Sequence, residues 1–405
     1  MRLAGAAAGL ASSWAATLWL FPWSDERVND LFVYRTFAEP FLSGDVPYRD
    51  IAFEYPPLAA PLIGLPGIAG TGEEAFRWAY ALWTLGAAVA VVLLCGALAR
   101  ATGGDDRRAM LAAALMPLLC GALLRTHFDL FPVALMLGGL LLVVRDRPRA
   151  GLAVLGLGAM TKAFPLLAAL VALAWLAGRG RRRDAWQGAL ACAAAIAVVA
   201  AAALAASPSG ALDAVTYHLE RPVQIESTPA LVLLGLDAAG AGEATGVSSH
   251  RSDGLEHPAA DAVASLFATA LVGLVALLCA AAARRPDRSA LVLAALTGVV
   301  AFAALGKVLS PQFVIWALPL GALAFAWRLH ALAAAVATAA VLTQVEFPAR
   351  YLDVVAREPF ALGVVALRNL MLLAAVALAL RALHARGHQE LLDRRRPAVA
   401  VGLDQ

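Results

Sequence analysis

Residues 76–98 read FRWAYALWTLGAAVAVVLLCGAL, an apolar stretch whose single charged side chain is Arg77. An α-helix rises 1.5 Å per residue, so about 20 consecutive apolar residues cross the hydrocarbon core of a bilayer. The stretch is therefore long and apolar enough to form a membrane-spanning helix. Because similar stretches recur along the sequence, we interpret the whole chain as an all-α polytopic membrane protein with about twelve transmembrane helices.

The predicted spans differ in length, and polar loops separate them. They cover residues 3–22, 76–98, 109–124, 130–144, 150–161, 164–177, 185–206, 260–283, 289–306, 313–327, 329–343 and 360–381.

The run 150–177 can be read as one tilted helix or as two short ones. Arginines flank it on both sides, and basic loops prefer the cytoplasm. Both flanks stay inside only if the run enters the membrane and returns. The sequence TKAFP, residues 161–165, suits the turning point because proline disfavours a helical residue before it. We therefore prefer two short helices.

The composition of the whole chain supports a membrane protein. Of its 405 residues, 61% are hydrophobic and 15% are charged, whereas soluble chains are about 45–50% apolar and about 25% charged. This excess is too large and too evenly spread for one buried core. It excludes a soluble enzyme, a disordered protein and a nucleic-acid binder. The four cysteines lie in apolar stretches without CxxC spacing, so we expect neither disulfides nor a metal site.

The placement of charges predicts the orientation. One set of alternating loops, together with Arg2 and the tail after residue 380, holds 20 of the 32 basic residues and 8 of the 29 acids. Basic loops face the cytoplasm, so we place both termini there and expect the chain in the cytoplasmic membrane. The result is an integral membrane domain, residues 1–383, and a basic cytoplasmic tail, residues 384–405. Long outer loops cover about 24–74 and 207–259, and small polar residues and glycines after Asp237 predict a flexible loop in the second.

Acidic and aromatic residues are interleaved in the first outer loop. Most of its seven acids can be solvated loop charges, but Asp30 follows the first span closely and opens an amphipathic stretch. The sequence Tyr55-Pro56-Pro57 cannot continue a helix and forces an extended turn at the membrane surface. Such a loop can present a carboxylate beside rings that stack on a sugar. The acids are Asp25, Glu26, Asp30, Glu39, Asp45, Asp50 and Glu54.

The two lysines of the chain, Lys162 and Lys307, both interrupt apolar stretches at the outer ends of predicted spans. A cation inside the membrane is costly and marks a functional site by default, although a lysine at a helix end can also snorkel to the interface. Arg221 and His218 lie on the same predicted side. Arginine suits phosphate because it donates two parallel hydrogen bonds.

A second polar cluster, Arg125, His127 and Asp129, lies between two apolar runs. It is either a ligand-binding turn or a self-satisfied turn in which Asp129 pairs with Arg125 and caps the next helix. The side chains of Gln224, Glu226 and Ser227 could bind sugar hydroxyls or be ordinary loop residues. The sequence has no metal-ligand spacing and no P-loop or Rossmann glycine pattern.

Several motifs occur in the order known from one enzyme family. DLFVY (30–34), GDVPYRD (44–50) and FEYPPL (53–58) resemble the first outer loop of glycosyltransferase family 87. These enzymes are polyprenol-phosphate-mannose-dependent mannosyltransferases of the C-type membrane superfamily. The resemblance runs from about residue 25 to residue 327, and it continues through RTHFD (125–129), TKAFP (161–165), YHLERPVQIES (217–227) and KVLSPQF (307–313).

The resemblance implies the C-type architecture and sugar transfer from a lipid-phosphate donor outside the cytoplasmic membrane, without a cofactor and with little or no need for metal. It assigns the general base to Asp30. Many C-type enzymes have paired acids here, whereas Asn29 precedes Asp30, which leaves Asp25 and Glu26 as rivals. The donor phosphate is assigned to Lys162, Lys307, Arg221 and His218. Substrate binding is assigned to Tyr34, Tyr48, Glu54, Tyr55, Arg125, His127, Asp129, Gln224, Glu226, Ser227 and Gln312.

The expected partners are a polyprenyl-phosphate sugar, most often mannose in this family, a lipid or glycan acceptor, and membrane lipids, with no nucleic acid. A transporter or flippase of a lipid-linked sugar is the main alternative, although the chain shows no internal duplication of the kind common in transporters. A non-catalytic membrane scaffold is the other. A transferase forms a glycosidic product in detergent, whereas a transporter needs two sealed compartments.

Overall fold

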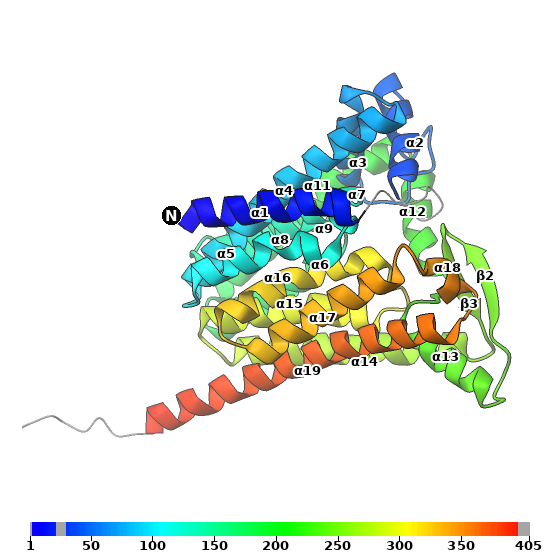
Figure 1. Cartoon of the computed structure of the whole chain (residues 1–405). Coiled ribbons are helices and arrows are strands. Elements are labelled where there is room, and N and C mark those ends of the chain that lie inside the picture. The colour runs from blue at the N-terminus through cyan, green and yellow to red at the C-terminus, as the bar shows by residue number, and fades with distance from the viewer. Residues whose placement is uncertain (1, 22–29, 396–405) are drawn as a thin grey trace, which may run out of the picture.

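The computed structural model describes residues 2–21 and 30–395, which form a long bundle of helices with shorter elements at one end (Figure 1). Six helices among these residues are long and apolar enough to cross a membrane. The prediction of a helical membrane protein is thus confirmed. The six are α1 (Arg2–Leu20), α4 (Glu73–Ala101), α11 (Arg182–Ala206), α14 (Ala260–Ala283), α15 (Arg288–Leu305) and α19 (Pro359–Arg395).

Shorter apolar helices occupy most of the other predicted spans. Their lengths of 12 to 17 residues are below the roughly 20 residues that an upright crossing needs. The count of twelve crossings therefore stays a prediction. These helices are α8 (Leu130–Val144), α9 (Pro148–Ala159), α10 (Pro165–Gly178), α16 (Val314–Ala326), which follows the 3-10 turn η3 (Pro311–Phe313), and α17 (His330–Glu346).

The predicted span 109–124 is not one helix. The chain forms α5 (Asp106–Ala114), α6 (Met116–Cys120) and α7 (Leu123–Thr126) instead. Pro117 lacks the amide proton that a continuing helix needs. Gly121 then adopts φ +53°, where a Cβ atom would lie 2.8 Å from the Phe21 ring, so the chain turns sharply at a position that suits glycine.

The run 150–177 is divided between α9 and α10, as predicted, with a break at residues 160–164. Close packing on either side explains the glycines of α9. A Cβ atom on Gly151 would lie 2.6 Å from the Gly139 carbonyl of α8, and one on Gly156 would lie 2.7 Å from the Cys192 carbonyl of α11. Small residues let helix backbones approach in this way in membranes. The break itself carries Lys162.

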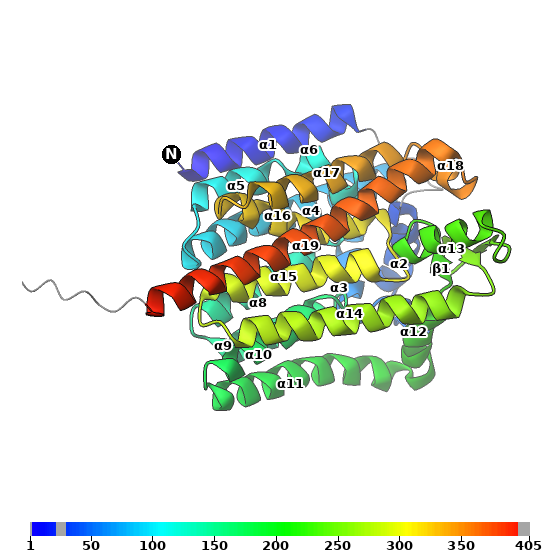
Figure 2. The same cartoon turned by 90° about the horizontal axis from the view of Figure 1, so that it is seen from below.

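The long loops between spans fold together at one end of the bundle, which we call the cap (Figures 1 and 2). Its position matches the two predicted outer loops. The described termini lie at the opposite end in both views. Which end faces the cytoplasm stays a prediction. The cap contains α2 (Asp30–Ser43), α3 (Ala59–Gly64), η2 (Leu65–Ala69), α12 (Pro208–Glu220), α13 (Thr228–Ala238), α18 (Tyr351–Val355) and a small sheet.

The prediction of a flexible loop after Asp237 is wrong for residues 245–256. This stretch forms a hairpin of β2 (Thr245–Ser249) and β3 (Ser252–Glu256), and β3 also pairs with β1 (Val223–Gln224) in the antiparallel order β1-β3-β2. Leu255 pairs with Val223 and is buried there. This pairing partner is about 30 residues away in the sequence, so the composition of the loop gave no sign of it.

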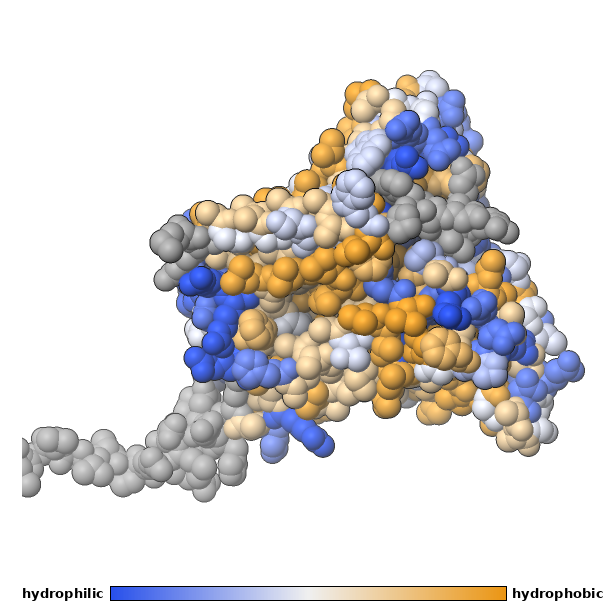
Figure 3. All heavy atoms as spheres, viewed as in Figure 1, coloured by the Kyte–Doolittle hydropathy of each residue, from blue (hydrophilic) through white to orange (hydrophobic). Residues whose placement is uncertain are grey.

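The surface has the layered character of a membrane protein. Figure 3 shows apolar residues across the middle of one face and hydrophilic residues gathered toward the two ends. The apolar segments of α11 and α14 are each only 11% buried, so lipid would cover most of their surface. At the end opposite the cap, Arg181 and Arg288 both pair with Asp146. The predicted tail is helical to Arg395, and residues 396–405 lie outside the described part.

Candidate active site

Asp30 is the first residue of α2 in the cap. Its Oδ2 atom lies 3.2 Å from the Tyr34 hydroxyl and 3.3 Å from Nε2 of His127, and its side chain is 33% exposed. Loss of solvation raises the pKa of Asp30, but His127, Lys162 and the Tyr34 hydroxyl together lower it below its ordinary value. The carboxylate is therefore ionised and reachable. Its rivals Asp25 and Glu26 lie outside the described residues.

His127 is oriented through its other ring nitrogen. Nδ1 lies 2.9 Å from the Thr126 hydroxyl and 3.2 Å from the Leu123 carbonyl. The Thr126 hydroxyl already donates to the Ala122 carbonyl, so Nδ1 must carry a proton to satisfy these contacts. These contacts turn Nε2 toward the Asp30 carboxylate, 3.3 Å away.

Lys162 pairs with the buried carboxylate of Asp129. Its Nζ atom lies 2.6 Å from Oδ1, which also accepts from the indole of Trp316 at 2.6 Å. The ammonium group faces the Phe128 ring at 4.7 Å from the centroid. The predicted alternative in which Asp129 pairs with Arg125 and caps α8 is wrong, because Arg125 donates to the Phe21 carbonyl and Asp129 makes no capping hydrogen bond.

The tyrosines of the first outer loop pack into an aromatic cluster. Tyr34 stacks on Tyr80 with centroids 5.5 Å apart, and Tyr55 meets Phe128 edge to face at 5.3 Å. Tyr34 and Tyr48 are buried, and the Tyr48 hydroxyl donates to the Tyr55 carbonyl at 2.5 Å. These rings hold α2 and Asp30 in place. Of the three tyrosines assigned to substrate binding, Tyr55 alone is half-buried and so retains exposed surface.

Glu54 joins the first outer loop to the second. Its carboxylate lies 3.1 Å from Nη1 of Arg251, at the turn of the β2–β3 hairpin, and its carbonyl lies 2.8 Å from Nε2 of His218. The Arg251 guanidinium also stands over the Phe37 ring at 5.1 Å. Loss of solvation raises the pKa of Glu54, while Arg251 opposes the shift. The hairpin therefore closes onto the loop that carries Asp30.

The remaining predicted cations lie along the same side of the cap. Lys307 donates to the Leu219 carbonyl at 2.7 Å. Its pKa is lowered, first by loss of solvation and also by the charge of Arg221, against the opposing effect of Asp261. The pKa of His218 is lowered by loss of solvation and by Arg221 and Lys162. Arg221 is thus within electrostatic reach of both.

Arg221 has an unused donor. Among the residues that the structure describes, its buried Nε atom has no hydrogen-bond acceptor. A buried donor without a partner is costly, and a ligand oxygen would satisfy it. The structure brings Asp30, Glu54, His127, Lys162, His218, Arg221 and Lys307 together at the cap, and we call them the open cluster.

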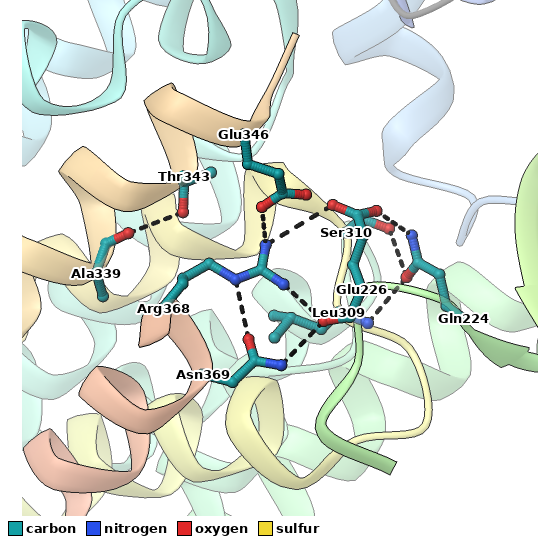
Figure 4. Close-up of polar contacts among 9 residues, drawn as sticks. All are labelled: Gln224, Glu226, Leu309, Ser310, Ala339, Thr343, Glu346, Arg368 and Asn369. Atoms are coloured by element: carbon teal, nitrogen blue, oxygen red, sulfur yellow. Dashed lines mark hydrogen bonds and ion pairs between the residues drawn. The ribbon is translucent and has the colours of Figure 1, made fainter. Parts of the chain in front are cut away.

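Other predicted site residues take part in internal contacts. Ser227 caps α13 by accepting from the Ala230 amide, and Gln224 and Glu226 are buried in a second cluster with Arg368 (Figure 4). Gln312 is half-buried in η3. Within residues 2–21 and 30–395, no group of three or more His, Cys, Asp or Glu side chains could hold a metal ion.

Three charged residues that are prominent in the structure were not predicted from the sequence, namely Arg251, Glu346 and Arg368. Arg368 and the adjacent Asn369 interrupt the predicted span 360–381. An arginine inside an apolar run is a functional candidate by default, so Arg368 could have been selected from the hydropathy of the sequence. Arg251 carried no such signal, because its partner Glu54 is almost two hundred residues away.

The comparisons identify the family. A model of glycosyltransferase family 87 matches residues 53–311. The match covers Glu54, Lys162, Arg221 and Lys307, whereas Asp30 precedes it. A comparison with curated proteins finds no significant match. Because the family model covers more than half of the chain, the protein belongs to glycosyltransferase family 87 and is a membrane glycosyltransferase.

Proposed function

We propose that the protein transfers a sugar, with mannose as the first candidate, from a polyprenyl-phosphate donor to a lipid or glycan acceptor at the outer face of the cytoplasmic membrane. The observation that carries the proposal is the open cluster. It combines a reachable, ionised carboxylate with cations around an unused arginine donor at one end of an apolar bundle. Sugar transfer from a phosphate ester needs both a base and positive charge on the departing phosphate.

Asp30 is the proposed base. Its carboxylate takes the proton of the acceptor hydroxyl as the acceptor oxygen bonds to the anomeric carbon. The bond from that carbon to the phosphate oxygen breaks, and polyprenyl phosphate leaves with the electron pair. A direct displacement of this kind inverts the anomeric centre. The contact with His127 and the Tyr34 hydroxyl orients the carboxylate for this step.

The cations would divide the work on the donor. Arg221 offers the unpartnered Nε atom, and Lys307 is half-buried beside it, so both can meet the phosphate. Charge-assisted hydrogen bonds of this type strengthen as negative charge develops on the leaving group. Lys162 is already neutralised by Asp129 and is 14% exposed. We assign Lys162 to packing against the Phe128 ring and to keeping Asp30 ionised through its positive charge.

The experiment that tests the function is a product assay. Purified protein in detergent is given labelled polyprenyl-phosphate mannose and an envelope-lipid extract, and the labelled product is identified by mass. The proposal expects a new glycosidic product and one polyprenyl phosphate released for each sugar transferred. Movement of the intact donor between sealed compartments, without such a product, would instead support the flippase alternative.

A further inference from the structure

A second charged cluster lies beside the open cluster and is completely closed. We call it the Arg368 cluster, and Figure 4 shows its members pointing toward one another. Each member is at most 3% exposed. They come from the second outer loop, the end of α17 and the first third of α19. The members are Gln224, Glu226, Glu346, Arg368 and Asn369.

Charge is not balanced in this cluster if every group takes its ordinary state. Nη1 of Arg368 lies 2.9 Å from Oε2 of Glu346 and 3.7 Å from Oε1 of Glu226. One guanidinium therefore faces two buried carboxyl groups. A buried charge without compensation costs several kcal/mol, by a common estimate. Among the described residues, Oε1 of Glu226 and Oε1 of Glu346 also have no hydrogen-bond partner.

A single proton removes both problems. A protonated carboxyl group carries no charge and supplies an O–H donor to its neighbour. Burial and the adjacent Glu346 raise the pKa of Glu226 well above its ordinary value, and the opposing effect of Arg368 is smaller. Asp253 of β3 also faces Glu226. It accepts a hydrogen bond from Tyr351 of α18 at 2.8 Å, and its negative charge increases the need for the proton.

The cluster is connected to the proposed phosphate site. Arg368 and Asn369 donate to the Glu226 carbonyl at 2.6 and 3.0 Å. Gln224 donates to the Glu226 carboxyl group at 2.8 Å and accepts from the Leu309 amide at 2.9 Å. The backbone N–H of Gln224 donates to the backbone carbonyl of Lys307 at 2.9 Å. A short chain of hydrogen bonds thus joins α19 to the segment that carries Lys307.

We propose that Glu226 and Glu346 share one proton, and that in this state Arg368 is a positioning residue that holds the segments of Arg221 and Lys307 against α17 and α19. The positioning role rests on the proposed function, whereas the shared proton does not. Arg368 touches no substrate in this proposal. It acts through Glu226, Gln224 and the backbone of residues 307–309.

The shared proton is tested by thermal unfolding of the full chain in detergent between about pH 5 and pH 9, with Glu226→Gln compared with wild type. The pKa of Glu226 is raised in the folded chain above its ordinary value of 4.5. The protonated group therefore contributes its full stability when the pH is below 4.5, and this stability is lost as the pH rises through the folded pKa. Glutamine mimics the protonated group and titrates in neither state. The unfolding temperature of Glu226→Gln minus that of wild type should therefore increase as pH rises.

The matched control is Glu256→Gln, which changes an exposed glutamate on β3. Its difference from wild type should stay constant with pH. A constant difference for Glu226→Gln as well would overturn the shared proton. The double variant Glu226→Gln/Glu346→Gln should be less stable than either single variant, because it leaves the buried Arg368 without a carboxylate. A double variant as stable as the single variants would contradict the assignment of one proton to the two glutamates.

The positioning role is tested by steady-state kinetics of Arg368→Lys and Gln224→Met. Both keep the proposed phosphate cations, and Gln224→Met serves if Arg368→Lys does not fold. We expect the donor KM to rise about tenfold or more, because a displaced Arg221 or Lys307 would lose one hydrogen bond to the charged phosphate. The acceptor KM should stay within about twofold. Equal changes in both KM values, or a loss confined to the amount of folded protein, would overturn the role.

These two readouts separate the proposals. If wild type forms no product from the polyprenyl-phosphate donor, the proposed function fails and the positioning role fails with it. The unfolding comparison still decides whether the proton is shared. If wild type is active and the donor KM does not move in either variant, the positioning role alone is contradicted.

Discussion

The open cluster and the Arg368 cluster contain the same kinds of groups but differ in what remains available. In the open cluster the Asp30 side chain is 33% exposed and Arg221 keeps an unpartnered donor. In the Arg368 cluster Glu226 and Glu346 are 0% exposed. The presence of charged groups therefore does not by itself separate the two clusters, whereas exposure does. A reachable carboxylate and an unpartnered cationic donor distinguish the proposed reactive cluster from the proposed supporting one.

The two clusters are also built from different parts of the chain. Asp30 and Glu54 belong to the first outer loop, and Arg251 from the second loop closes onto them. The Arg368 cluster instead joins the second loop to α17 and α19 through Glu226. The second loop thus contributes to both clusters, and this shared loop is the route by which we propose that Arg368 affects donor binding. Substitutions in one cluster at a time test this difference.

The largest effect is expected from Asp30→Asn. The variant keeps the size and most contacts of the side chain but cannot accept the proton, so kcat should fall by about 10²–10⁴-fold, the usual contribution of a general base. The unfolding temperature should change little. The control is Asp45→Asn, an exposed acid of the same loop, which should transfer sugar at the wild-type rate. Retained activity in Asp30→Asn would exclude it as the base.

Lys162→Met should reduce both stability and transfer. It leaves the fully buried Asp129 without its cation, and removing one partner of a buried ion pair costs about 3–5 kcal/mol. Thermal unfolding and product formation are measured together. The double variant Lys162→Met/Asp129→Asn keeps an acceptor for the Trp316 indole and should recover stability but not full transfer. Full transfer by the double variant would show that Lys162 has no role in the field around Asp30.

Arg221→Met should weaken donor use by about tenfold or more, because a hydrogen bond to a charged group contributes about 1.5–3 kcal/mol. The donor KM is the quantity to measure. Lys307→Met should have a smaller effect, since Lys307 is half-buried and already donates to the Leu219 carbonyl. A larger effect of Lys307→Met than of Arg221→Met would reverse the proposed order of the two cations.

The smallest effect is expected from Arg251→Ala. The Arg251 side chain is 49% exposed, whereas Glu54 is 10% exposed. Because water reaches the arginine, we expect the pair to contribute about 1 kcal/mol, the upper end for exposed pairs. Transfer should fall by no more than about fivefold. Arg49→Ala breaks a more exposed pair with Asp50 in the same loop and should leave transfer unchanged. An equal loss in both variants would show that hairpin closure onto Glu54 has no special importance.

Local patterns predicted much of the fold. Apolar length located the six long helices, and the Lys162-Ala163-Phe164-Pro165 stretch located the break between α9 and α10. The three-way division of α5, α6 and α7 was not predicted, because its close contact between Gly121 and Phe21 depends on tertiary packing. The hairpin of residues 245–256 was missed for the same reason, since its pairing with Val223 is not local.

The candidate site was predicted as a set of residues but not as a set of partners. Residue type and position selected Asp30, Lys162, Arg221 and Lys307. Sequence proximity suggested that Asp129 pairs with Arg125, whereas its partner is Lys162, 33 positions away. Nothing local distinguishes the two possibilities, because a side-chain contact across helices depends on which faces pack together. The accessibility that separates Asp30 from Glu226 is likewise a property of the folded chain.

We propose that one open cluster holds the base on one side and the phosphate cations on the other. Donor binding to wild type, Asp30→Asn and Arg221→Met, measured with labelled polyprenyl-phosphate mannose in detergent without acceptor, tests it most directly. We expect Asp30→Asn to bind donor within a few-fold of wild type and to transfer sugar about 10²–10⁴-fold more slowly, while Arg221→Met should bind donor about tenfold or more weakly. Wild-type donor affinity in Arg221→Met, or loss of affinity in Asp30→Asn, would contradict it.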